Sequence, residues 1–220
     1  MEDFEKHQSH LENSQGDKNH VLLRGWIDTP IRQDHQNDEA AIYSTILRIE
    51  RIPGVIDYIP VYIKENKLVF LGKQPHVGDY MEIEGYFHSK DVYFDENKRR
   101  MENFVYADKI SFSTEMLPSV NEVHIVGEIL KCRQPRVARN GQHLIDFLVK
   151  VRRKTHKYSK IPCIVWGAYK VIKIEEAGVG TKIEIAGRIE SREYIKIQDG
   201  EKISRMLYEI SVTGFKIKAE

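Results

Sequence analysis

The run Asn121-Glu122-Val123-His124-Ile125-Val126-Gly127-Glu128-Ile129 decides the fold, because it has a strand pattern and occurs twice in the chain. Every second residue from Val123 onward is apolar or glycine, which is typical of a strand with one buried face. The earlier copy is Asn19-His20-Val21-Leu22-Leu23-Arg24-Gly25-Trp26-Ile27. A glycine inside a strand marks a bulge or a sharp bend, which the closure of a small barrel requires.

The two runs belong to a repeat that extends over nearly the whole sequence. A shift of 102 residues aligns the two halves without a gap, so we expect two copies of one domain. We place a flexible tail at residues 1–18, an acidic domain at 19–116 and a basic domain at 119–220. Beyond the first run, the aligned pairs include Ile59-Pro60 with Ile161-Pro162, Val77-Gly78 with Val179-Gly180, Gly85 with Gly187 and Tyr106 with Tyr208.

Each copy contains five alternating segments and one short helical segment between the third and the fourth, which is the plan of an OB-fold barrel. We therefore predict an all-β protein of two tandem five-stranded OB-fold barrels. Another small five-stranded barrel, such as an SH3-like one, is the alternative. The expected strands of the basic copy are Val123–Leu130, Leu144–Val151, Ile161–Trp166, Lys182–Glu190 and Met206–Val212, with a helix at Ala168–Ala177. Those of the acidic copy are Val21–Asp28, Ala41–Ile52, Ile59–Ile63, Met81–Ser89 and Phe104–Phe112, with a weaker helix at Asn66–Pro75.

Charge divides the two copies. The net charge of the 220 residues is +1, but residues 1–118 hold 14 Lys and Arg against 21 Asp and Glu, a net of −7. Residues 119–220 hold 20 against 12, a net of +8. An acidic half joined to a basic half indicates that only the basic half meets a polyanion.

Composition excludes several classes of protein. No run approaches the roughly 18 apolar residues of a membrane span, and the polar start at Met1-Glu2-Asp3 shows no signal peptide. Cys132 and Cys163 give no disulfide framework, which fits a reduced, cytoplasmic setting. The sequence lacks a phosphate-cradling glycine loop and any recognised catalytic or metal-ligand spacing. We expect no enzyme activity, cofactor or metal.

The basic copy resembles the bacterial single-stranded-DNA-binding protein family from Asn121 to Thr213. The Asn-x-Val start, the glycine of the first hairpin, an apolar third strand ending in Trp166-Gly167 and a Gly-x-x-Ile fourth strand from Gly180 follow in the family's order. The acidic copy resembles the family more faintly. The resemblance implies that the aromatic side chains of Trp166 and Tyr194 stack on bases.

The candidate site residues also make sense without the resemblance. Single strands are bound by cations along the backbone path and aromatic faces for the bases. Two basic loops and one strand face of the second copy supply both, because Arg188, Arg192 and Tyr194 are evenly spaced. The predicted nucleic-acid-binding residues are Lys131, Arg133, Arg136, Arg139, Arg152, Arg153, Lys154, Lys157, Tyr158, Lys160, Trp166, Arg188, Arg192 and Tyr194.

The acidic copy carries Asp34, Asp38 and Glu39 where the other copy is basic. Phosphate would be repelled there, so we expect this copy to be structural or to bind a protein partner. The leading hypothesis is a non-enzymatic binder of single-stranded DNA in replication, repair or recombination. The alternatives are an OB-fold interaction module of a replication or primosome assembly and an RNA-binding protein, since RNA needs the same cations and aromatic rings.

Two departures from the family narrow the expectation. Lys160 stands where the family places an aromatic residue, which removes one stacking platform. The sequence ends in the basic run 215–220, whereas full-length family members end in a disordered acidic tail that recruits replication and repair proteins. A specialised paralogue, a mobile-element protein or a primosome-type protein is therefore as plausible as a housekeeping one. Family members commonly work with four barrels, so we expect a homodimer of this two-barrel chain.

Overall fold

The computed structural model describes residues 19–36, 40–69, 75–95, 98–112, 117–153, 157–198 and 201–218. The expected tail at 1–18 lies outside these residues. The first copy comprises β1 (Asn19–Ile27), β2 (Arg32–Gln36), β3 (Ala41–Ile52), β4 (Val55–Lys64), α2 (Glu65–Val69), β5 (Tyr80–Asp95) and β6 (Lys98–Phe112). The second comprises β7 (Val120–Cys132), β8 (Arg136–Val137), β9 (His143–Arg152), β10 (Tyr158–Trp166), α3 (Ala168–Ala177), β11 (Lys182–Gln198) and β12 (Glu201–Ile217).

The five main strands of each copy close into a ring. In the first copy β1 pairs with β3 and β5, β3 with β4, β5 with β6, and β4 runs parallel to β6. The second copy repeats this ring through β7, β9, β10, β12 and β11. The prediction of two tandem five-stranded OB-fold barrels is confirmed, with α3 at the predicted residues. The short strands β2 and β8 were not predicted.

The glycine of the first strand allows the close strand crossing that closes each barrel. A Cβ on Gly127 would lie 2.6 Å from the carbonyl oxygen of Lys150 and 2.6 Å from Cγ1 of Val149, closer than packing allows. Here β7 leaves its pairing with β11 and passes to β9. The predicted sharp bend is therefore a tight crossing.

The gapless repeat is wrong in the last strand of each barrel. Val61 of β4 pairs with Val105 of β6, whereas Cys163 of β10 pairs with Ile210 of β12. The third strands are thus related by the shift of 102, but the last strands by 105. The hairpin formed by β11 and β12 is three residues longer than the hairpin formed by β5 and β6, so Tyr106 is not the structural counterpart of Tyr208.

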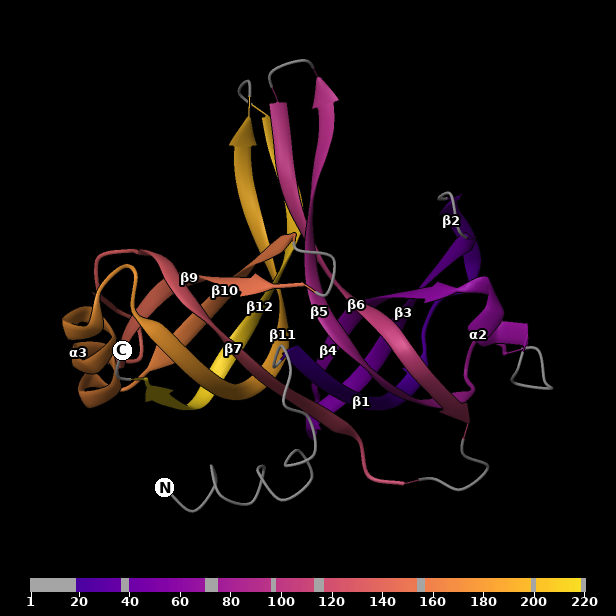
Figure 1. Ribbon diagram of the computed structural model, residues 1–220, viewed down its shortest axis with the longest axis horizontal. Helices are drawn as coiled ribbons and strands as arrows, with labels where there is room; N and C mark the ends of the chain where they lie inside the picture. The colour runs from indigo at the N-terminus through magenta and orange to yellow at the C-terminus, as the bar shows by residue number, and fades with distance from the viewer. Residues whose placement is uncertain are drawn as a thin grey trace.

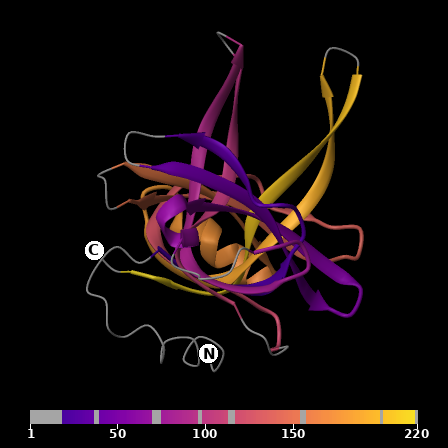
Figure 2. The ribbon, with the colours of Figure 1, turned by 90° about the vertical axis from the view of Figure 1, so that its right-hand side faces the viewer.

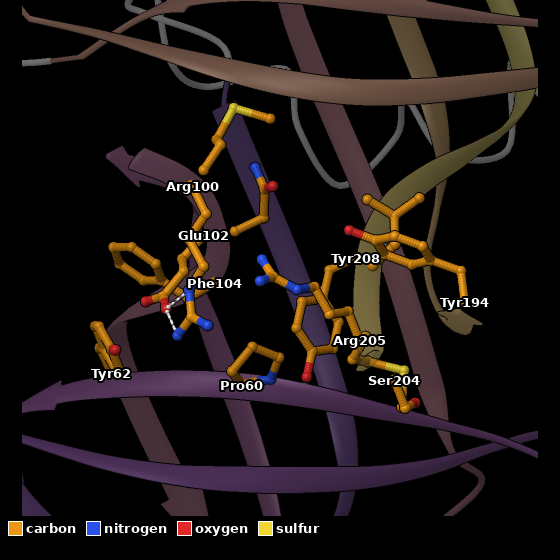
Figure 3. A pocket seen from close by; sticks show the side chains of 13 residues that line it. Pro60, Tyr62, Arg100, Glu102, Phe104, Tyr194, Ser204, Arg205 and Tyr208 are labelled. Carbon is orange, nitrogen blue, oxygen red and sulfur yellow. Dashed lines mark hydrogen bonds and ion pairs between the residues drawn. The ribbon is translucent and has the colours of Figure 1, made fainter. Parts of the chain in front are cut away.

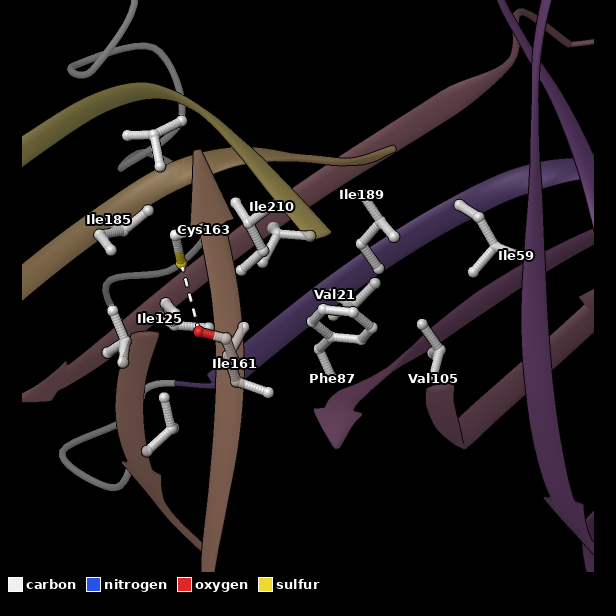
Figure 4. Close-up of a cluster of buried hydrophobic side chains, with 14 of the residues drawn as sticks. Val21, Ile59, Phe87, Val105, Ile125, Ile161, Cys163, Ile185, Ile189 and Ile210 are labelled. Carbon is white, nitrogen blue, oxygen red and sulfur yellow. Dashed lines mark hydrogen bonds between the residues drawn. The ribbon is translucent and has the colours of Figure 1, made fainter. Parts of the chain in front are cut away.

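The first strands of the two copies pair with each other. They join both barrels into a 12-stranded sheet through antiparallel pairing of β1 with β7. Val21 pairs with its own repeat counterpart Val123, so a pseudo-twofold axis passes between them. One cluster of buried side chains extends from one barrel into the other (Figure 4). The copies consequently satisfy each other's first-strand edges inside one chain.

Polar contacts repeat on both sides of this axis. The backbone N–H of Lys160 donates to Oγ of Ser89 (2.7 Å), and that of Tyr58 donates to Oγ of Ser191 (2.9 Å). The N–H groups of Ser89 and Ser191 donate in return across the interface, the latter to Oδ1 of Asp57 (3.0 Å). These reciprocal bonds fix how the barrels are oriented.

Two long hairpins, β5–β6 and β11–β12, extend to the same side of the molecule (Figure 1) and diverge like a V (Figure 2). The fourth strand of the second copy, predicted to end at Glu190, continues to Gln198. Each barrel therefore carries a long hairpin that the sequence did not predict, and the two hairpins leave the molecule on the same side.

Acid should weaken the contact region near His88, which lies among the rings of Tyr86, Phe104 and Tyr106. Burial, reinforced by the charge of Arg153, lowers the pKa of His88 to about 4 from the ordinary value of 6.5. Between pH 6.5 and pH 4, His88 is protonated in the unfolded chain but neutral in the folded chain. The free energy of unfolding therefore decreases by up to about 3 kcal/mol as the pH falls through this range. Urea unfolding at pH 7 and pH ~4.5 tests this, with His88→Phe as the comparison. Equal pH dependence in both proteins would refute the assignment.

Candidate nucleic-acid interface

A groove of about 560 Å³ crosses the basic barrel, and we call it the basic groove. Its walls come from the end of β7, the segment leading into β8, the strands β9 and β10, and the hairpin β11–β12. It brings together part of the predicted site, namely Lys131, Arg133, Arg136, Arg192 and Tyr194. The other lining residues are Met101, Asp146, Phe147, Leu148, Pro162, Cys163, Leu207 and Glu209.

Tyr194 lies at the side of the basic groove. It shares a face of β11 with Arg192, as the alternation of the strand predicts. Its exposed fraction of 39% leaves much of the side chain open to solvent. Leu207 and Leu148 contribute apolar surface near it. An exposed ring beside apolar surface can hold an unpaired base by stacking.

The cations of the basic groove fall into two groups. Nη2 of Arg192 lies 3.2 Å from Oε1 of the buried Glu209, and Arg136 pairs with Asp146. Burial raises the pKa of Glu209. Lys131 and Arg133 are exposed, and neither has a carboxylate partner among the described residues. Lys131 and Arg133 are therefore the cations most available to phosphate.

Other predicted residues lie outside the basic groove. Tyr158, which is 52% exposed, lies at one end of β10 with Nζ of Lys150 4.6 Å from its ring centroid, and Trp166 lies at the other end. Arg188 pairs with Glu190 at 2.6 Å. Arg139 lies in the turn after β8, Arg152 ends β9, Lys157 precedes β10, and Lys160 is part of the contact between the copies. Lys154 lies outside the described residues.

Arg153, which the sequence predicts to bind nucleic acid, takes part in the contact between the copies through its guanidinium. Nε donates to Oγ of Ser159 (2.7 Å), and the group also bonds the carbonyl oxygen of Ser89. Its counterpart by the shift of 102 is Arg51, whose Nη1 donates to Glu190 of the other copy (2.7 Å). The repeat itself holds this signal, since an arginine kept in both an acidic and a basic copy indicates a role other than phosphate binding.

Sequence reasoning missed the apolar floor of the basic groove and the contribution of Met101 from the other copy. The proline at 162 was visible as a repeated residue, since Pro60 is its counterpart. The acidic copy has a corresponding groove of about 330 Å³, which contains Thr29 and Ser44 where the basic groove has Lys131 and Asp146. The same fold thus carries a charged groove in one copy and a more neutral one in the other.

Removing the ring of Tyr194 should weaken strand binding directly. Tyr194→Ala is expected to cost about 1–3 kcal/mol of binding free energy, the usual contribution of one stacked base. Trp166→Ala should lose a similar amount if Trp166 also stacks, although this residue is outside the basic groove. Fluorescence titrations measure binding and thermal melts measure folding, so together they distinguish a ring that stacks on a base from a ring that packs in the fold. A lower melting temperature with unchanged binding would assign Trp166 to packing, and unchanged binding in Tyr194→Ala would remove Tyr194 from the site.

Comparisons with known proteins concern the second copy and the fold as a whole. Residues 120–217 match the sequence model of the Single-strand binding protein family, which confirms the resemblance of the second copy. No curated protein matches the chain. Among the described residues, no helix could cross a membrane and no group of three or more His, Cys, Asp or Glu side chains could hold a metal ion.

Solved structures extend the likeness to both copies. The wild-type single-stranded DNA binding protein from Thermus aquaticus aligns with a TM-score of 0.72 and 16% identity, over 93% of this chain and 94% of that chain. A deletion mutant of it gives 0.73 and 16%, over 93% and 96%. The dimeric N-terminal domain of PriB from Thermoanaerobacter tencongensis covers 44% of this chain and 98% of that chain, with 28% identity and a TM-score of 0.38. The Thermus alignments show that the tandem-barrel fold is shared.

Proposed function

We propose that this protein binds single-stranded DNA in the basic groove without catalysing a reaction on it. The observation that carries the proposal is the position of Tyr194 beside Arg192, Lys131 and Arg133 in the copy that matches the single-strand binding family. The cations neutralise phosphates and the ring stacks on a base, which duplex DNA keeps inside its own stack. Arg136, Arg139, Arg152, Lys157 and Tyr158 extend the proposed contact surface.

The role is one in replication, repair or recombination, where single strands are exposed, and the partners are proteins of those processes. We place it in the reducing cytoplasm, which fits free Cys132 and Cys163. We propose the domain boundaries 19–116 and 119–220. These boundaries keep β1 whole within the first domain and β7 whole within the second.

Titrations with fluorescently labelled single-stranded DNA, RNA and duplex DNA at two salt concentrations test the function. Single-stranded DNA is expected to bind most tightly, with an affinity that falls steeply with salt because counterions are released. Tighter binding of RNA would assign the protein to RNA, since the 2′-hydroxyl is the feature that distinguishes the two. Equal or tighter binding of duplex DNA would contradict the proposal.

We also propose a homodimer, which would give four barrels. The edges of β1 and β7 already pair with each other inside the chain, so a contact between two protomers must use another surface. The hairpin β11–β12 exposes Ile195 and Ile197 at 66% and 70%, which suits association. Sedimentation equilibrium at micromolar protein should give twice 25.7 kDa, and the double variant Ile195→Lys, Ile197→Lys should sediment as a monomer. A single species of 25.7 kDa for the unaltered chain at every concentration would exclude the dimer.

A further inference from the structure

A second hollow lies at the base of the V between the two hairpins, and we call it the inter-hairpin crevice (Figure 3). Its volume is about 400 Å³, and it is bounded by β4 and β6 from the acidic copy and by β11 and β12 from the basic copy. It belongs to neither barrel alone. The tandem arrangement creates it.

The inter-hairpin crevice connects the grooves of the two barrels. Met101, Tyr194 and Leu207 line both the crevice and the basic groove. Pro60 and Tyr62 line both the crevice and the groove of the acidic copy. A single strand of DNA in the basic groove can therefore pass Tyr194, enter the inter-hairpin crevice and reach Tyr62 along one continuous hollow.

The side chains of the inter-hairpin crevice suit unpaired bases. Tyr62 lines the crevice and lies against Phe104, with ring centroids 4.4 Å apart. Phe104 is only 7% exposed and supports one side of the Tyr62 ring, while Nζ of Lys90 donates to the Tyr62 hydroxyl (2.8 Å). Tyr208 lies on the opposite wall (Figure 3). Aromatic faces on two sides of a hollow are the arrangement that holds bases without regard to their sequence.

The inter-hairpin crevice has a mixed charge, with two arginines against one glutamate among its lining residues. Its charged lining residues are Arg100, Glu102 and Arg205. Nη2 of Arg100 lies 2.6 Å from Oε1 of Glu102. Nζ of Lys90 lies 4.5 Å from the ring centroid of Tyr62, and it lies 3.8 Å and 3.9 Å from the carboxylates of Glu102 and Asp34. The net charge of −7 for the first half thus does not describe this face.

We propose that the inter-hairpin crevice is a second base-binding site, where a single strand held in the basic groove crosses onto the acidic copy. The inference rests on the proposed function of the basic groove and deepens it. It changes the expected role of the acidic copy, whose aromatic residues then bind the same strand. Short strands would use the basic groove alone, whereas long strands would use both.

Strand length separates the two sites. Thymidine oligonucleotides of about 8 and about 24 nucleotides suit one barrel and both barrels, since one OB fold covers roughly 4–16 nucleotides. Tyr62→Ala should weaken binding of the long strand about tenfold, the effect of losing one stacked base, and leave the short strand unaffected. Tyr169→Ala is the matched control, because Tyr169 is 74% exposed on α3 and lines none of these hollows.

A second variant guards against misfolding of the first. Arg205→Gln keeps a long polar side chain and should also weaken only the long strand, with a shallower salt dependence because one phosphate contact is lost. Thermal melts establish that each variant is folded. Long-strand binding that is unchanged in both folded variants, or short-strand binding that falls equally, would overturn the crevice site. If the unaltered protein binds neither strand, the function proposed for the basic groove fails and the crevice site fails with it.

Discussion

Reversing the charge of Lys131 and Arg133 is expected to weaken single-stranded DNA binding at least about a hundredfold at low salt. The double variant Lys131→Glu, Arg133→Glu removes two exposed cations from the basic groove and introduces two carboxylates where phosphates would lie. For single strands each lost phosphate contact lowers the slope of log affinity against log salt by about 0.7, so the slope should decrease by about 1.4. Titrations across a salt series measure both quantities.

The control is Lys173→Glu with Lys182→Glu, which changes net charge equally on α3 and at the start of β11, outside the basic groove. It should lose little affinity, because charges distant from the strand are screened by salt. Equal losses in the two double variants would mean that net charge, and not the basic groove, controls binding.

Removal of the Asp57 carboxylate is expected to destabilise the protein by up to about 3 kcal/mol, the cost of leaving a buried hydrogen-bond donor without its acceptor. Asp57 is fully buried between the copies, where Oδ1 accepts the N–H of Ser191 and Oδ2 lies 3.2 Å from Nε of Arg51. Asp57→Ala leaves the N–H of Ser191 without its acceptor. Urea unfolding measures the loss.

Two further variants test whether the lost hydrogen bond at Asp57 causes the loss of stability. Asp57→Ser should lose less than Asp57→Ala, because Ser159 holds the equivalent position across the axis and accepts both from Ser89 and from Arg153. Asp91→Ala removes a more exposed carboxylate whose ion pair with Arg99 is 3.5 Å long, and should cost no more than about 1 kcal/mol. A loss under about 1 kcal/mol in Asp57→Ala would show that the network does not hold the copies together.

The barrels could be predicted because their signals are local and repeated. Alternation marks each strand, α3 follows from the run Ala168–Ala177, and the tight crossing needs the glycine at 127. The cations of the basic groove could be predicted for a similar reason, since Lys131 and Arg133 lie in one short segment after a recognisable strand.

The relation between the copies could not be predicted, because it depends on contacts distant in the sequence. Pairing of β1 with β7 joins residues about 100 apart, and no local pattern specifies it. Several residues after Glu190 are charged and exposed, so the sequence does not show the pattern of a half-buried strand there. The prediction therefore ended β11 too early. Arg153 looked like part of a basic loop, and only the structure shows its bonds to the other copy.

Crosslinking a single strand to the protein and mapping the attached peptides tests the central claim most directly. An oligonucleotide carrying photoreactive thymidine analogues is irradiated in complex with the full chain, and the modified residues are identified by mass spectrometry. Nucleotide should be attached to peptides that contain residues 131–136 and Tyr194, which line the basic groove. Attachment confined to α3 and the surface around Tyr169, with residues 131–136 and Tyr194 unmodified, would contradict the assignment of the basic groove as the binding site.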